Sequence, residues 1–424
     1  MKLTKEEKNW VLYDVGNSAF TLLVSTIMPI YFNYLAEQEG LSSVDYLAYW
    51  GYAASIATLI VALIGPVFGT LADTKGFKKP IFTIALGVGA TGCIAMGFAK
   101  QWLLFLIIYI IAKIGFSASL IFYDSMLSDV TTDERMDQVS SQGYAWGYIG
   151  SCVPFIVCLC IVLGSGKLGI SMDLAMGISF CIVAAWWILM TLPMLKTYRQ
   201  INYVERKPHA FAESFRRIGR TFQNVRKEKK IFLFLLAFFF YIDGVYTIID
   251  MATAYGSALG LDSTGLLLAL LVTQFVAFPC AILFGRLAQR FRTENLITIC
   301  ITAYLGIALF ACVLSTQLQF WILAILVGMF QGGIQALSRS YYARIIPAEQ
   351  SGEYFGLLDI CGKGASFLGT TIVSVVSQLT GDINKGVGMI AVLFVVGIIF
   401  FRIAVGSENA KRKVAGMTSV DITE

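Results

Sequence analysis

The candidates for chemistry in this sequence are a few charged residues that interrupt long apolar runs. Asp243 follows an uninterrupted apolar run that begins at Ile231. At about 1.5 Å of rise per residue, a helix would place its carboxylate about 18 Å from the start of that run. Lys113 stands in the middle of another run, and Asp359 and Lys363 stand four residues apart in a third, where they can pair. If these runs cross a membrane, such ionisable groups are costly and by default mark a solute or ion pathway.

Motifs for other kinds of chemistry are missing from the sequence. No Gly-x-x-x-x-Gly-Lys-Ser/Thr sequence is present, which disfavours a pump driven by ATP. The stretch 87–92 matches Gly-x-Gly-x-x-Gly, but it lies inside an apolar run with no strand before it, so we interpret it as close helix packing. The single histidine, His209, and nine cysteines without zinc-site spacing indicate no metal or nucleophile cluster. We expect no enzyme activity and no cofactor, and a proton-coupled cycle would have to use a buried carboxylate, for which Asp243 is best placed.

The composition of the chain indicates that these runs lie in a membrane. Of the 424 residues, 57% are hydrophobic and 14% are charged, against about 45–50% and about 25% in soluble proteins. So few charges cannot coat the surface of soluble domains, and a disordered chain would need low hydrophobicity and high charge. Residues 1–8 are charged, with no short apolar core and cleavage site, so we expect the first apolar run to be a retained helix.

Twelve apolar runs are long enough to cross a bilayer as helices, for which about 20 residues are needed. The predicted spans are 10–35, 46–72, 80–99, 102–126, 138–163, 174–195, 231–255, 263–286, 294–315, 318–343, 354–379 and 384–406. Each is expected to be helical because backbone groups in lipid must be satisfied within the segment. The predicted fold class is an all-α polytopic membrane protein with twelve transmembrane helices.

The loops between these spans predict the orientation. Nearly all of the 32 Lys and Arg fall in alternate loops, beginning with the N-terminus, whereas the other loops carry only Lys100, Lys167 and Lys385. Loops rich in Lys and Arg stay in the cytoplasm. We therefore expect a multi-pass protein of the cell (inner) membrane with both termini cytoplasmic.

The stretch 196–230 is the one long loop, and it divides the chain into six plus six helices. It holds eleven Lys and Arg against three Glu. Between Phe211 and Val225, apolar residues recur at helical spacing opposite arginines, which predicts a basic amphipathic helix on an anionic inner leaflet. A positive-inside linker explains these residues better than nucleic-acid binding does. The predicted domains are 1–195 (N-terminal six-helix half), 196–230 (linker), 231–406 (C-terminal six-helix half) and 407–424 (cytoplasmic tail).

The two halves share a repeated loop. The sequence F-G-x-L-A begins at Phe68, at the end of the second span, and again at Phe284, at the end of the eighth. Each copy is followed by a polar, basic turn. A second match begins at Gly115 of the fourth span and Gly333 of the tenth. Two six-helix halves in parallel repeat are the architecture of the major facilitator superfamily.

The first loop resembles the signature of that superfamily, G-x-L-A-D-x-x-G-x-[RK]-[RK]. The matching residues are Gly69, Leu71, Ala72, Asp73, Gly76, Lys78 and Lys79. Gly69 would permit close helix packing, Gly76 would make the turn, and Asp73 would accept hydrogen bonds from a helix N-terminus. The resemblance implies that this loop latches a cytoplasmic gate. The predicted gate also includes Asp14, Asp124 and Arg339, which lie nearer the cytoplasm than the midplane residues do.

Four stretches resemble the vacuole-effluxer-like branch of the superfamily, which is named for an autophagy-related vacuolar amino-acid effluxer of yeast. They begin at Trp10 (WVLYDVGNSAF), Tyr241 (YIDGVYTI), Gln331 (QGGIQALSRS) and Glu353 (EYFGLLDICGK). The resemblance covers essentially the whole chain. One departure is Val15-Gly16, where relatives often carry Trp-Ala, and it affects the shape of the pathway along the first helix.

The resemblance also implies which residues face the solute, because the first, fourth, seventh and tenth helices line the central cavity of major facilitators. The predicted substrate-binding residues are Asn17, Lys113, Asp243, Tyr246, Gln331 and Gln335. The predicted coupling residues are Asp243, Asp359 and Lys363, although Asp359 and Lys363 are also interpretable as a structural pair. Separated acidic and basic groups suit a zwitterion or small polar solute better than a bulky apolar drug.

These features together predict a secondary transporter that moves a small polar or zwitterionic, amino-acid-like solute by alternating access, with protons as a candidate coupling ion. We expect it to work as a monomer in the bilayer. Two alternatives stay open. A lipid or lysolipid flippase would use the same fold with little need for midplane carboxylates, and a membrane signalling or scaffold protein would use the basic 196–230 loop as its partner site.

Overall fold

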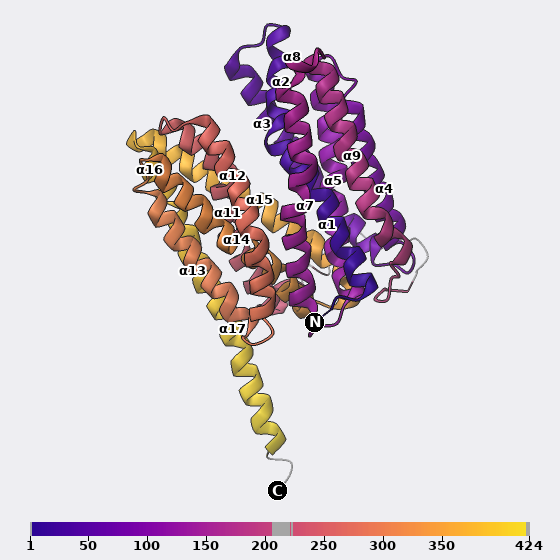
Figure 1. The fold of residues 1–424 in the computed structure, drawn as a ribbon. Coiled ribbons are helices and arrows are strands. Elements are labelled where there is room, and N and C mark those ends of the chain that lie inside the picture. Colours follow the sequence, from indigo (N-terminus) through magenta and orange to yellow (C-terminus); the bar gives the residue numbers. More distant parts are fainter. Residues whose placement is uncertain (1, 206–220, 222–223, 421–424) are drawn as a thin grey trace. The chain divides into compact units, whose positions relative to one another are not determined.

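The computed structural model describes residues 2–205, 221 and 224–420. Over these residues the chain is almost entirely helical, and its one β-type contact is an isolated parallel bridge between Thr74 and Val204 (Figure 1). His209 and most of the amphipathic segment predicted between Phe211 and Val225 lie outside the described residues, so that prediction stays untested. The predicted all-α fold class is confirmed.

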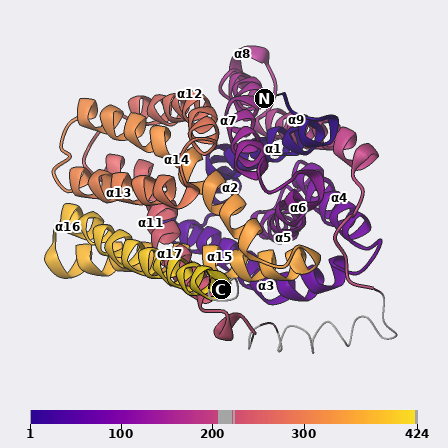
Figure 2. The ribbon, with the colours of Figure 1, turned by 90° about the horizontal axis from the view of Figure 1, so that it is seen from below.

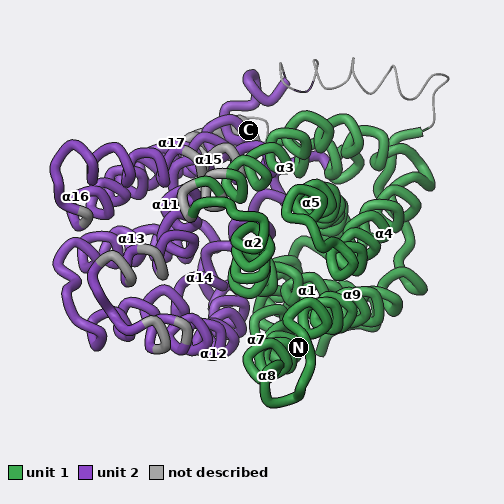
Figure 3. The backbone as a smooth tube through the Cα atoms, turned by 90° about the horizontal axis from the view of Figure 1, so that it is seen from above, with its two compact units in different colours: residues 1–214, 348–357 green, residues 215–347, 358–424 purple. Residues whose placement is uncertain are grey.

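The chain divides into two compact units (Figure 3). Unit 1 consists of residues 1–214 and 348–357, and unit 2 of residues 215–347 and 358–424. The helices of unit 1 are α1 (Lys5–Ser25), α2 (Ile27–Gln38), α3 (Ser43–Ala72), α4 (Lys78–Met96), α5 (Trp102–Ser125), α6 (Leu127–Val130), α7 (Met136–Leu163), α8 (Ser165–Leu168) and α9 (Met172–Thr197). Those of unit 2 are α11 (Lys229–Ala258), α12 (Ser263–Leu287), α13 (Thr293–Ala311), α14 (Gln317–Ile345), α16 (Ile383–Gly388) and α17 (Ile390–Val420).

One helix, α15 (Ser351–Thr380), contributes to both units: its first turns cluster with unit 1 and its remainder with unit 2. It follows a short 3₁₀ turn, Ala348–Gln350. The boundaries predicted from the sequence place all of residues 354–379 in the C-terminal half. Those domain boundaries stay a prediction.

The predicted spans coincide with the observed helices. Among the residues that the structure describes, eleven helices are long and apolar enough to cross a membrane, and the span predicted at 354–379 lies on the continuous helix α15. The first span bends at Thr26, between α1 and α2. Pro29 explains the bend, because a proline ring clashes with the carbonyl four residues earlier. The last helix runs on to Val420, through most of the predicted tail (Figure 1).

The helix neighbours in unit 2 repeat those in unit 1. In unit 1, α3 and α4 pack on α5, while α1 and α4 pack on α9 (Figure 2). In unit 2, α12 and α13 pack on α14, while α11 and α13 pack on α17. A tyrosine–serine hydrogen bond also recurs: Tyr13 to Ser119 at 2.6 Å in unit 1, and Tyr241 to Ser338 at 2.7 Å in unit 2. These two pairs support the internal duplication that the repeated loop predicts.

The outer surfaces of the helices carry large apolar side chains. Leu63, Phe98 and Leu163 are each at least two-thirds exposed, and similar residues occur on most of the long helices. A soluble protein rarely exposes so much contiguous apolar surface, so these faces are suited to lipid. Two of the three glycines in the 87–92 stretch pack closely, as expected: a Cβ on Gly92 would lie 2.8 Å from that of Ala112, and one on Gly89 would lie 2.6 Å from the Trp187 ring, whereas one on Gly87 would meet no atom within 4 Å.

Candidate functional site

The signature loop between α3 and α4 is a tight turn of five residues. α3 ends at Ala72 and α4 begins at Lys78. Gly76 has a φ of 79°, in the left-handed region, where residues with a Cβ are strained. A Cβ on Gly76 would meet no atom within 4 Å, so its requirement for glycine is conformational. Gly76 therefore makes the turn, as its place in the motif predicts.

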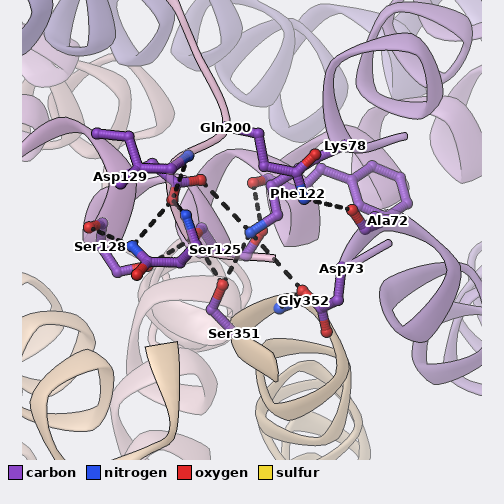
Figure 4. A network of polar contacts seen from close by, with 12 residues as sticks. Ala72, Asp73, Lys78, Phe122, Ser125, Ser128, Asp129, Gln200, Ser351 and Gly352 are labelled. Atoms are coloured by element: carbon purple, nitrogen blue, oxygen red, sulfur yellow. Dashed lines mark hydrogen bonds and ion pairs between the residues drawn. The ribbon is translucent and has the colours of Figure 1, made fainter. Parts of the chain in front are cut away.

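Asp73, the acidic residue of the signature, accepts hydrogen bonds from a helix N-terminus, as expected. It is fully buried, and its Oδ1 accepts from the backbone N–H of Gly352 at 2.7 Å. Its Oδ2 accepts from the N–H of Glu353 at 3.0 Å. Figure 4 shows Asp73 beside Gly352. These are among the first amides of α15, which have no partner within their own helix and carry the positive end of its dipole. The carboxylate thus caps α15.

Glycines allow α3 and the start of α15 to approach at backbone contact. A Cβ on Gly69 would collide with the carbonyl oxygen of Gly352, and a Cβ on Gly352 would lie 2.7 Å from the carbonyl oxygen of Gly69. One turn further on, a Cβ on Gly356 would lie 2.9 Å from Cα of Pro66. Any side chain at Gly69 or Gly352 would push α15 away from Asp73.

Lys78 is the buried cation of this network. Its side chain has no solvent exposure, and its Nζ lies 2.9 Å from Oγ of Ser351, 3.6 Å from Oδ2 of Asp129 and 3.7 Å from Oδ1 of Asp73. Ser351 also donates to the carbonyl oxygen of Ser125 at 3.0 Å. A lysine in the first turn of α4 faces the unfavourable end of the helix dipole, so its burial depends on the two carboxylates. We call Asp73, Lys78, Asp129 and Ser351 the gate network.

Asp129, which the sequence did not single out, is the most heavily bonded member of the gate network. Its Oδ2 accepts from the hydroxyl of Tyr198 at 2.5 Å. Its Oδ1 accepts from the backbone N–H groups of Ile201 and Asn202 at 3.2 and 2.8 Å, and from Nδ2 of Asn202 at 3.0 Å. Burial, together with the Asp129 charge, holds the pKa of Tyr198 well above its usual range. The hydroxyl therefore stays protonated and remains a donor.

The other residues predicted for the gate lie elsewhere. Asp14 is buried, where it accepts from Tyr123 at 2.7 Å and from Asn17 at 3.3 Å. Lys79 is exposed, although it is the direct neighbour of buried Lys78. Asp124 is half-buried on α5, and Arg339 is buried on α14 in unit 2. Their roles in the gate stay predictions.

In unit 2, Asp243 is a fully buried carboxylate on α11. Its Oδ1 accepts from the N–H of Gly369, on α15, at 2.9 Å and from the hydroxyl of Thr247 at 3.3 Å. Its Oδ2 has no hydrogen-bond partner among the atoms that the structure describes. A Cβ on Gly369 would lie 2.6 Å from Oδ1 and would collide with the Thr247 hydroxyl, so this arrangement requires glycine at that position.

The six predicted substrate-binding residues divide between the units, and their convergence on one site stays a prediction. Asn17 is buried and Lys113 is half-buried in unit 1, with Nζ of Lys113 5.6 Å from the centre of the Phe116 ring. In unit 2, Tyr246 and Gln335 are half-buried.

Gln331, also in unit 2, lines a small cavity of about 50 Å³ between α11, α12 and α14, next to Thr273 and Gln274. Among the predicted coupling residues, Asp359 is half-buried on α15. The side chain of Lys363 lies outside the described residues, so its pairing with Asp359 is untested.

Comparison with known proteins gives the family. The family model described as "Vacuole effluxer Atg22 like" matches residues 3–134 and 128–415. An uncharacterized MFS-type transporter of Bacillus subtilis (strain 168), YxiO, is 44% identical over 403 residues, which are 94% of each chain. Autophagy-related protein 22 of Botryotinia fuckeliana is 24% identical over 316 residues, covering 67% of this chain and 53% of that protein. The chain thus spans about half the length of this fungal relative.

Solved structures show the same fold. The fucose:proton symporter FucP of E. coli superposes with a TM-score of 0.69 at 16% identity, over 94% of this chain and 97% of that one. A bacterial homologue of the iron transporter ferroportin, in its outward-facing state, gives a TM-score of 0.68 at 14% identity, over 94% and 98%. These likenesses confirm the major facilitator fold, and the relatives confirm a multi-pass membrane transporter that is not an enzyme. The chain therefore belongs to the vacuole effluxer Atg22-like family of major facilitator transporters.

Proposed function

We propose that this transporter is proton-coupled, that Asp243 carries the proton, and that the cargo is a small zwitterionic, amino-acid-like solute moved by alternating access. We place the protein in the cell membrane with both termini in the cytoplasm, on the strength of the Lys and Arg distribution in its loops. The surroundings of Asp243 are the observation that carries the proposal.

The two oxygens of Asp243 differ in a way that suits proton exchange. Oδ1 is held by Gly369 and Thr247, whereas Oδ2 is buried with no partner in the described structure. Leaving a polar atom unsatisfied in an apolar interior costs about 1–3 kcal/mol, and a functional role is one of the reasons for which native proteins retain such atoms. A proton can bind Oδ2 and neutralise the carboxylate while the two bonds at Oδ1 stay in place. The Asp243 side chain can therefore be neutral or charged while it accepts the same two hydrogen bonds, from Gly369 and Thr247.

The proposed solute class follows from the chemistry of the predicted binding residues. Lys113 offers a cation to a carboxylate, Asp243 an anion to an ammonium group, and Gln331 both a donor and an acceptor. A solute that carries both charges can use all three, whereas an apolar solute would leave them unsatisfied. A screen of thermal stability against amino acids, dipeptides, sugars and nucleosides tests this, because a ligand that binds the folded state raises its apparent stability.

Transport by purified protein in liposomes tests the proton carrier. With the solute that the screen identifies, the native protein should accumulate it when a proton gradient is imposed. Asp243→Asn should lose this accumulation, because the amide cannot exchange a proton. It should still exchange solute without a gradient at high solute concentration, with weaker affinity because the contact with the ammonium group is lost. Asp250→Asn is the matched control: Asp250 lies on the same helix, seven residues on, and is exposed. Gradient-driven accumulation by Asp243→Asn at the native rate would refute the role of Asp243.

We also propose that the gate network closes the cytoplasmic side of the pathway by holding the first turn of α15. Asp73 caps that turn, Lys78 donates to Ser351, and Gly69 permits the contact. Asp73→Asn should weaken the cap and increase labelling of a cysteine placed beneath the turn. Unchanged labelling and transport in that variant would count against the gate.

A further inference from the structure

The segment that follows α9 crosses the gate network on the side of Asp129. We call residues 198–205 the linker strap. Its Tyr198 hydroxyl, the N–H groups of Ile201 and Asn202 and the Asn202 amide supply four donors to the two oxygens of Asp129. Nδ2 of Asn202 also donates to the carbonyl oxygen of Ser128 at 3.0 Å. Hydrogen bonds to a charged acceptor are stronger than those between neutral groups, so this is a strong attachment.

The same strap pairs with the signature loop itself. The N–H of Val204 donates to the carbonyl oxygen of Asp73 at 2.8 Å, and the N–H of Lys75 donates to the carbonyl oxygen of Val204 at 3.1 Å. Gln200 accepts from the N–H of Gly76 at 2.9 Å and donates to the carbonyl oxygen of Ala72 at 3.1 Å. The strap thus bonds to Ala72, Asp73, Lys75 and Gly76, in and next to the turn that presents Asp73 to α15.

The charges of the gate network explain why this attachment matters. Two buried carboxylates, Asp73 and Asp129, face one buried ammonium, Lys78. Asp73 finds its remaining donors on α15, and Asp129 finds its donors on the linker strap. Without the strap, Asp129 would keep only the ammonium of Lys78 as a donor among the contacts that the structure describes. It would then compete with Ser351 and Asp73 for that ammonium.

We propose that Tyr198 and Asn202 are positioning residues for the gate: by holding Asp129, the docked linker strap fixes Lys78 where it donates to Ser351 of α15, so that release of the strap opens the gate. The proposal rests on the gate role of the network. On this proposal, displacing the strap lowers the fraction of transporter molecules whose cytoplasmic gate is closed. The first residues of the linker would thus regulate the gate without touching the solute.

The test uses a cysteine reporter beneath α15 in the full-length protein. Ser125 is fully buried and its carbonyl oxygen accepts from Ser351, so a thiol in Ser125→Cys should react with a membrane-impermeant maleimide only when the α15 turn has left. The background replaces Cys160 and Cys181, the two exposed native cysteines, with serine. Labelling is measured in inside-out vesicles.

Three variants separate the strap from the gate. Asn202→Ala should raise the labelling rate roughly tenfold, because it removes one hydrogen bond to a charged group. Asp73→Asn should raise it as well, through the loss of the α15 cap. Glu205→Gln, in the same strap, is the matched control. It removes an exposed ion pair with Lys75 of the signature loop, and exposed pairs contribute little to stability. Labelling should therefore stay within about twofold of the native rate.

A disulfide lock then tests docking itself. Thr74 and Val204 form the parallel bridge between the loop and the strap, so cysteines at both positions can join them on oxidation. In the Asn202→Ala protein, the oxidised lock should return labelling to the native rate, whereas the same protein without the two lock cysteines should keep its raised rate under the same oxidant. A merely structural role for Asn202 would leave labelling unaffected by the lock.

The outcomes distinguish the two proposals. If Asp73→Asn raises labelling and Asn202→Ala does not, the gate stands and the strap proposal is wrong. If neither raises it, the gate itself is wrong. If Asn202→Ala protein cannot be purified folded, Tyr198→Phe, which removes only the hydroxyl that donates to Asp129, takes its place in the same lock experiment, with the same expected reversal by oxidation and the same refuting result.

Discussion

Replacing Lys78 with methionine should open the gate, and the size of the effect follows from its surroundings. Lys78 is fully buried between Asp73 and Asp129. Removing one member of a buried ion pair costs about 3–5 kcal/mol, because it leaves an uncompensated buried charge. Here the two carboxylates keep other donors: two amides of α15 on Asp73, and four groups of the linker strap on Asp129. We therefore expect Lys78→Met to cost about 3 kcal/mol, the lower end of that range.

In the open gate, water can reach the carboxylates of Asp73 and Asp129. The free-energy cost of losing Lys78 therefore destabilises the closed gate alone. About 3 kcal/mol corresponds to a roughly 150-fold change in the ratio of closed to open protein. In the Ser125→Cys background, Lys78→Met should therefore label faster by about two orders of magnitude. Lys79→Met is the matched control, since Lys79 is adjacent but exposed, and should label at nearly the native rate.

A double variant tests whether the effect comes from charge. Adding Asp129→Asn to Lys78→Met removes one of the two unbalanced carboxylates, so labelling should fall back by a large part of the increase, a coupling expected between groups in contact. The reasoning is refuted if Lys78→Met labels within threefold of Lys79→Met, or if Asp129→Asn in the double variant increases labelling further.

Three further predictions concern single positions. Gly76→Ala should cost about 1–2 kcal/mol of stability, measured by thermal unfolding, because its φ of 79° is strained for alanine although space is free. Gly369→Ala should abolish uptake while the protein stays folded, because the methyl group would displace Asp243 and Thr247; Gly306→Ala, where nothing lies within 4 Å, should keep native uptake and thermal stability. Lys75→Met should leave uptake and stability nearly unchanged, since its ion pair is exposed; a large loss in either would contradict this assignment.

The sequence predicted the helices and part of the gate because those features leave local patterns. Apolar runs bounded by charge located the long helices, and the signature motif located Asp73, Gly69 and Gly76. Each of these three makes the contact or turn expected of it. The bend at Thr26 was also readable in principle, from Pro29, but the apolar run on both sides concealed it.

Contacts between distant segments left no such pattern. Asp129 meets Asn202, 73 residues away, and each looks like an ordinary polar loop residue. Lys79 was predicted with Lys78, yet consecutive residues at a helix start point about 100° apart, so one is buried and its neighbour exposed. Whether an oxygen of Asp243 has a hydrogen-bond partner depends on the atoms that surround it. The position of Asp243 along its helix does not reveal those atoms.

The most direct test of the proposed function is the movement of protons together with the solute. Liposomes that contain the purified protein and a trapped pH-sensitive dye receive the solute found by the thermal screen, with no gradient imposed. Native protein should give a pH change that tracks solute flux. Asp243→Asn should exchange solute with no pH change, at a solute concentration high enough to offset the lost contact with the ammonium group. A pH change of native size in Asp243→Asn would contradict the proposal that Asp243 carries the proton.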